Sequence, residues 1–159
     1  MLTLGLLLQG LWLRWRWRAW VARALQLPPP LHRVRVEQGL HILTQDGVDL
    51  VADHYAPRTA GDYPTVLIRS PYGRHARESA FGLLTAFYAF RFAERGYHVI
   101  VQDVRGRFES TGAFSPMLNE KADGLVTLAW IRQQPWHNGQ LGLWGGSYLG
   151  AGPVGHGPG

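Results

Sequence analysis

The 159-residue chain contains no cysteine, which excludes disulfide bridges, iron–sulfur clusters and thiolate zinc sites. Only one of its 16 basic residues is a lysine, Lys121, and no carboxylate follows Asp123. Seven histidines are present, but none is spaced with carboxylates as metal ligands usually are. We therefore expect structural histidines, with no metal and no cofactor.

Positive charge is concentrated at the start of the chain. The net charge is +5, yet residues 1–36 contain six arginines and no acid, which leaves ten basic and eleven acidic residues in the remainder. Those six are Arg14, Arg16, Arg18, Arg23, Arg33 and Arg35. The body thus has a net charge of −1 and gives no electrostatic reason to expect nucleic-acid binding.

No apolar run reaches the roughly 20 residues that a membrane-spanning helix needs. The run from Leu2 to Leu13 also lacks the basic start and small-residue cleavage site of a secretory signal, so a cytoplasmic location is expected. The Trp and Arg residues that follow do not separate onto two helix faces. We interpret residues 1–30 as a poorly ordered or locally packed leader, with membrane contact as the alternative, ending at Pro28–Pro30.

Residues 31–152 are predicted to form a partial α/β domain. The pattern predicts a hairpin turning at Asp46-Gly47, strands in "PTVLIRS", "YHVIVQDVRG" and "QLGLW", and helices over 80–95 and 119–134. Asn119 is the expected N-cap of the second helix, and all three strands are expected to be buried. Alternating strands and helices predict a mostly parallel sheet with helices on both faces.

The stretch "QLGLWGGSYLG" places Ser147 after the last of these strands, beside two glycines. Ligands of such sheets bind at the carboxyl ends of the strands, where Tyr72 and Asp103 are also expected. A tight strand-to-helix turn needs small neighbours and would present a serine as a nucleophile. The match to G-x-S-x-G is incomplete, since Leu149 occupies the last position, and a glycine-rich loop serine is the alternative.

Five ordered motifs resemble the cocaine esterase/X-prolyl dipeptidyl peptidase (CocE/NonD) group of α/β-hydrolases. They are "DGVDLVADHYAP", "PTVLIRSPYGR", "YHVIVQDVRGRFESTGAF", "NEKADG" and "QPWHNGQLGLWGGSYLG", and together they span about Val34 to Gly150. The nucleophile motif of this group is G-x-S-Y-x-G, which the sequence matches. The resemblance implies the N-terminal half of an α/β-hydrolase fold, with an N-terminal hairpin and flanking helices.

The resemblance also assigns roles to individual residues. Ser147 matches the nucleophile that forms the acyl-enzyme, the backbone N–H of Tyr148 matches one oxyanion donor, and the hydroxyl of Tyr72 matches the other. A phenol is chemically suited to that task, because it gives a short hydrogen bond to a developing negative charge. Without the motif, Tyr72 would be interpreted as a loop aromatic. Asp103, Arg105 and Arg107 are expected to brace the neighbouring loop by ion pairs.

Members of this group place the acid and the histidine of the triad after the serine. Here only His156 follows Ser147, within a Gly/Pro-rich tail (residues 153–159) that is not expected to continue the fold. We therefore expect a truncated or frame-shifted serine hydrolase that is inactive alone. Its substrates would be small esters or peptides. The alternatives are an X-prolyl dipeptidyl aminopeptidase, an acyltransferase, or a non-catalytic remnant whose leader binds a membrane or partner.

Overall fold

The computed structural model describes residues 20–145, and the two ends of the chain lie outside this range. Contacts divide the chain after Pro30 into two units, of which the second, from Leu31, contains the sheet. No helix within the described range is long and apolar enough to cross a membrane. Ser147, Tyr148, the tail and the leader up to residue 19 fall outside it.

The predicted hairpin is formed by β1 (Val34–Leu43) and β2 (Asp49–Pro57), which pair antiparallel. Its turn has Gly47 at φ +81°, a left-handed conformation that glycine adopts without a Cβ penalty. The Thr44 N–H donates to the Val48 carbonyl at 2.8 Å and closes the turn. The register shifts between Glu37 and Leu40, where the chain bulges.

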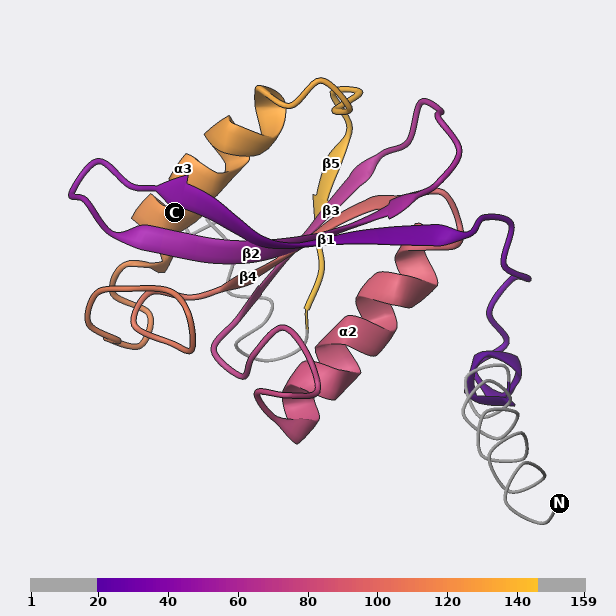
Figure 1. The fold of residues 1–159 in the computed structure, drawn as a ribbon, viewed down its shortest axis with the longest axis horizontal. Coiled ribbons are helices and arrows are strands. Elements are labelled where there is room, and N and C mark those ends of the chain that lie inside the picture. Colours follow the sequence, from indigo (N-terminus) through magenta and orange to yellow (C-terminus); the bar gives the residue numbers. More distant parts are fainter. Residues whose placement is uncertain (1–19, 146–159) are drawn as a thin grey trace, which may run out of the picture. The chain divides into compact units, whose positions relative to one another are not determined.

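The predicted strands and helices of the body are present, and the sheet is mixed (Figure 1). Its remaining strands are β3 (Thr65–Ser70), β4 (His98–Asp103) and β5 (Leu141–Leu143), in the order β1-β2-β4-β3-β5. The pairings of β3 with β4 and with β5 are parallel, whereas β2 pairs antiparallel with β4. Among the described strands, only β2 therefore runs against the others.

Helices cover both faces of the sheet, as predicted, with one on each face among residues 20–145 (Figure 1). Ala89 and Ala93 of α2 (Ala80–Ala93) pack on Val99 and Val101 of β4. On the other face, Leu128 and Ile131 of α3 (Glu120–Arg132) pack on Ile100. Successive side chains of a strand point to opposite faces, so one strand supplies both cores. β3 and β4 are buried throughout, as expected for covered strands.

Two details differ from the sequence predictions. Asn119 precedes α3, but its side chain makes no capping hydrogen bond; Glu120 and Asp123 of the first turn form ion pairs with arginines. β5 is not buried, because Gly142 and Leu143 are exposed. Within the described residues β5 has a neighbour on one side only, β3, so the apolar run of "QLGLW" forms an edge strand.

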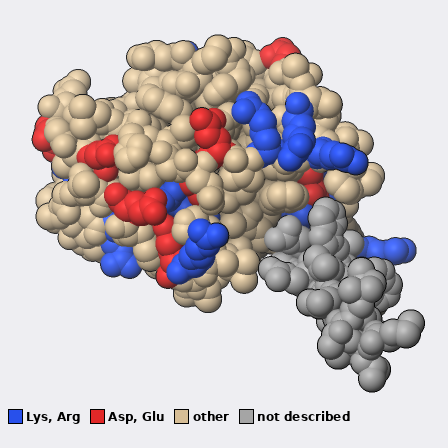
Figure 2. Space-filling model, viewed as in Figure 1, with Lys and Arg blue, Asp and Glu red and all other residues tan. Residues whose placement is uncertain are grey.

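On the face shown in Figure 2, acidic and basic side chains both reach the surface, with uncharged groups between them.

Candidate active site

Tyr72 lies immediately beyond the carboxyl end of β3, at the edge where the parallel strands finish. Ser70 is the last residue of β3 and pairs with Asp103, the last residue of β4. On the other side of β3, β5 pairs up to Leu143, opposite Leu67. Strand ends of this kind form the usual ligand edge of an α/β sheet. The structure thus places Tyr72 at that edge, while Ser147 and Tyr148 lie outside the described residues.

The backbone around Tyr72 is held by three hydrogen bonds. The Tyr72 N–H donates to Ser70 Oγ at 3.0 Å, and the Ser79 hydroxyl donates to the Tyr72 carbonyl. The carbonyl of Pro71, one residue earlier, accepts from Arg107 Nε at 3.0 Å. Tyr72 is 36% exposed, and its ring lies against Phe81, with ring centroids 5.3 Å apart. The backbone of this loop is held in place, and Tyr72 remains accessible to solvent.

A cavity of about 310 Å³ opens beside Tyr72. Its walls are Pro71, Tyr72, Arg107, Phe114 and Pro116. The guanidinium of Arg107 lies 5.2 Å from the ring centroid of Phe108 and 5.3 Å from that of Phe114, distances typical of cation–π contacts. The cavity is therefore largely apolar, with one cation and one phenol in its wall.

A buried arginine underlies the same loop. Arg74 is 1% exposed, and its guanidinium is paired with Asp53, Glu109 and Asp103, the last at 2.7 Å. Burial raises the pKa of Asp103 to about 7, and the hydrogen bond from Arg74 offsets only part of that rise. The Arg74 N–H also donates to Glu78 at 2.5 Å, which ties the end of the loop to the residue before Ser79.

The loop between Tyr72 and Arg74 requires a glycine at position 73. Its φ is +99°, and a Cβ at this position would lie 2.9 Å from both Cβ and Oε2 of Glu78. Any other residue would combine backbone strain with a clash.

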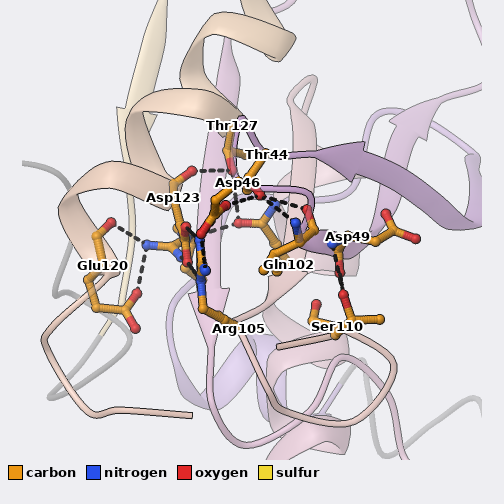
Figure 3. Close-up of polar contacts among 12 residues, drawn as sticks. Thr44, Asp46, Asp49, Gln102, Arg105, Ser110, Glu120, Asp123 and Thr127 are labelled. Carbon is orange, nitrogen blue, oxygen red and sulfur yellow. Dashed lines mark hydrogen bonds and ion pairs between the residues drawn. The ribbon is translucent and has the colours of Figure 1, made fainter. Parts of the chain in front are cut away.

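Arg105 joins three separate segments at this end of the molecule. It bonds Asp46 of the hairpin turn at 2.5 Å and Asp123 of α3 at 2.6 Å (Figure 3). These bonds hold the pKa of the Asp46 carboxyl well below its usual range. The predicted ion-pair roles of Asp103 and Arg105 are confirmed. The prediction that Arg107 forms an ion pair is wrong, because its described contacts are the Pro71 carbonyl and the rings of Phe108 and Phe114.

Two histidines are buried away from this edge. His98 begins β4, and its Nδ1 lies 2.9 Å from Nε2 of His54. Trp136 stacks on both rings, with centroid distances of 4.4 Å to His54 and 4.6 Å to His98. Burial lowers the pKa of His54 to about 3 and that of His98 to about 4. Both are therefore neutral at pH 7. Within residues 20–145, no group of three or more His, Asp or Glu side chains is arranged so that it could hold a metal ion.

No role was assigned to Ser79 or Arg74 from the sequence, and Arg107 was not placed beside the cavity. Ser79 carried a usable signal, because a serine just before an apolar helical repeat is a typical N-cap. Arg74 stands in the motif "SPYGR", but nothing in a lone arginine reveals that its charge is buried. The burial of this arginine depends on carboxylates that β2, β4 and the loop after β4 supply.

The family model described as X-Pro dipeptidyl-peptidase (S15 family) matches residues 46–155, more than two thirds of the chain. The chain belongs to the S15 family. A curated relative, the cocaine esterase of Rhodococcus sp. (strain MB1 Bresler), is 38% identical over 116 residues, which are 72% of this chain and 20% of the esterase. Both findings agree with the resemblance carried by the five motifs.

Two solved hydrolase structures share the fold described here. A selenomethionine-labelled α-amino acid ester hydrolase matches with a TM-score of 0.59 and 29% identity, over 74% of this chain and 22% of its own. A CocE/NonD family hydrolase from Staphylococcus aureus matches with a TM-score of 0.63 and 25% identity, over 73% and 24%. The chain spans between 20% and 24% of the length of these three relatives.

Proposed function

We propose that this S15 chain carries the nucleophile and oxyanion-binding part of a serine hydrolase that acts by acyl transfer. The observation that carries the proposal is the position of Tyr72, beyond the carboxyl end of β3 and beside a cavity. β3 also pairs with β5, the strand that leads to "GGSYLG". The family match and the identity to a cocaine esterase support the same chemistry.

In the proposed mechanism, the Ser147 oxygen attacks the substrate carbonyl carbon as a base takes its proton. The carbonyl oxygen becomes an oxyanion, which accepts hydrogen bonds from the Tyr72 hydroxyl and the Tyr148 N–H. The tetrahedral intermediate collapses as the base passes the proton to the leaving oxygen or nitrogen, which departs as an alcohol or amine. Water then loses a proton to the base as it attacks the acyl-enzyme, and the acid product leaves as Ser147 receives that proton.

We expect the 159-residue chain alone to be inactive or nearly so. A serine needs an oriented base, and no carboxylate follows Asp123 to orient a histidine. Loss of triad members lowers turnover on the order of 10⁶-fold. A burst of p-nitrophenol from p-nitrophenyl acetate, abolished by Ser147→Ala, would contradict this expectation.

The hydrolase proposal is tested by joining residues 1–152 to the part of the Rhodococcus cocaine esterase that follows its matching segment. We expect the joined chain to turn over p-nitrophenyl acetate, and Ser147→Ala to remove that activity. Circular dichroism and a thermal melt establish that both chains are folded. Turnover that persists in Ser147→Ala, or a folded joined chain without activity, would refute the proposal.

An X-prolyl dipeptidyl aminopeptidase is the second candidate, favoured by the description of the matching family. Comparing Xaa-Pro-p-nitroanilides with p-nitrophenyl esters as substrates of the joined chain separates the two. A higher kcat/KM for the anilides supports the peptidase, and a higher value for the esters supports the esterase.

A further inference from the structure

Two consecutive carbonyl groups of the Tyr72 loop are each held by a donor from a different part of the chain. The Pro71 carbonyl accepts from Arg107 Nε at 3.0 Å, and Arg107 belongs to the segment after β4. The Tyr72 carbonyl accepts from the Ser79 hydroxyl, which immediately precedes α2. The peptide plane between Pro71 and Tyr72 and the one after Tyr72 are thereby both fixed.

Both donors are themselves held in place. Ser79 is the N-cap of α2: its Oγ accepts from the Gly82 N–H at 2.8 Å while its hydrogen points to the Tyr72 carbonyl. The guanidinium of Arg107 lies near the rings of Phe108 and Phe114, which restricts its side chain. Neither donor is a mobile surface group that meets a carbonyl by chance.

The start of α2 also contacts the ring of Tyr72. Phe81, in the first turn, packs against that ring with centroids 5.3 Å apart. A tyrosine that is 36% exposed retains rotamer freedom unless its backbone and one face are both constrained. The hydrogen bonds from Ser79 and Arg107 set the backbone, and Phe81 covers the face.

We propose that Ser79 and Arg107 are positioning residues for Tyr72, holding its phenol at the edge of the cavity in one orientation. The inference rests on the proposed function, in which the Tyr72 hydroxyl donates to an oxyanion. Fixed donors matter in such a site because they stabilise developing charge without reorganising. The competing explanation is that the two bonds stabilise the fold in general and have no specific effect on Tyr72.

Separation-of-function variants distinguish the two explanations. Ser79→Asp keeps an acceptor for the helix N-terminus but has no hydrogen to donate to the Tyr72 carbonyl. Arg107→Met keeps the length and apolar stem of the side chain but removes the donor, whereas Arg107→Lys retains one. Arg77→Met is the matched control, because Arg77 is exposed in the same loop.

The 159-residue chain is labelled with 3-fluorotyrosine, and the ¹⁹F resonance of Tyr72 is assigned from its loss in Tyr72→Phe. We expect this resonance to shift and broaden in Ser79→Asp and in Arg107→Met, and to return towards its wild-type position in Arg107→Lys. The other tyrosine resonances, the circular dichroism and the control Arg77→Met should remain as in the wild type.

An unchanged Tyr72 resonance in both Ser79→Asp and Arg107→Met would overturn the proposal, even if either variant lowered the melting temperature. Equal changes at all tyrosines would also overturn it, since they would indicate general destabilisation. This readout is independent of catalysis. Retained activity of Tyr72→Phe in the joined chain would refute the oxyanion role of Tyr72, whatever the spectra show.

Discussion

The guanidinium of Arg74 lies 2.7 Å from the carboxylate of Asp103, and neither side chain is more than 1% exposed. Asp53 is equally buried and pairs with the same guanidinium. Breaking a buried ion pair costs more than an intact pair contributes, because it strands a charge in a medium of low dielectric constant. The loop that carries Tyr72 is thus built over a polar core.

Arg74→Met is expected to lower the free energy of unfolding by about 3–5 kcal/mol, because Asp53 and Asp103 lose their shared partner. Urea denaturation at pH 7 measures the change. The exposed Arg77→Met serves as the control and should change stability by less than about 0.5 kcal/mol. A loss of under 1 kcal/mol for Arg74→Met would show that Asp53 and Asp103 do not depend on Arg74 for their stability in the folded chain.

The contribution of His54 and His98 to stability is expected to fall as the pH falls below about 6.5. Burial lowers their pKa values to about 3 and about 4, so between pH 6.5 and 4 the unfolded chain binds protons that the folded chain does not. At pH 5 each ring accounts for up to about 2 kcal/mol of lost stability. Asp103 acts in the opposite direction, because its raised pKa of about 7 lets the folded chain bind a proton that the unfolded chain does not. Urea denaturation of the wild type and of His98→Gln at pH 7.5 and at pH 5 measures the histidine contribution, because the contribution of Asp103 is common to both chains.

The variant His98→Gln should make the pH dependence of stability shallower, since one of the two shifted groups is removed. If His98→Gln retains the full wild-type pH dependence, the shifted histidine does not contribute as argued.

Gly73→Ala is expected to destabilise the chain by more than Gly139→Ala. Both glycines have positive φ, +99° and +89°, but only at Gly73 would a Cβ meet close neighbours. The backbone cost, of order 1 kcal/mol, is common to both, so the difference reports the contact with Glu78. Thermal melts of the two variants measure it, and equal melting temperatures would count against a close contact.

Arg105→Met is expected to cost clearly more stability than Asp46→Asn. Removing the arginine leaves Asp123, which is 1% exposed, with only the more distant Arg69 at 3.9 Å as a cationic partner, whereas Asp46 is 59% exposed and can return to water. Exposed ion pairs contribute about 0–1 kcal/mol, and weakening the pairing of a buried charge costs more. Parallel urea denaturations compare the two variants. Similar losses for both would contradict the assignment of Asp123 as the stabilising partner.

In the chain joined to the cocaine esterase segment, Tyr72→Phe is expected to lower kcat by about 10²–10³-fold with little change in KM. Removal of one oxyanion donor costs about this much, because the hydrogen bond strengthens only as charge develops. Steady-state kinetics with p-nitrophenyl acetate measure both constants. An increase in KM at constant kcat would assign Tyr72 to substrate binding and not to the oxyanion.

The strands and helices could be predicted because their signals are local. The turn at Asp46-Gly47, the apolar run that forms β4 and the helical spacing in α2 each follow from short stretches of sequence. The exposure of β5 could not be predicted, since an apolar run gives no information on whether the strand lies in the middle or at the edge of the sheet. The position of Arg107 was equally hidden, because its partners Pro71 and Phe114 come from separate loops.

The strand order has a consequence for the growing polypeptide during translation. β2 and β3 follow one another in the chain, yet β4 lies between them in the sheet. Until residues 98–103 have left the ribosome, the edges of β2 and β3 that later pair with β4 expose unpaired amides to solvent or to a chaperone. Unpaired edges of this kind promote aggregation, and the emergence of one six-residue segment covers two of them at once.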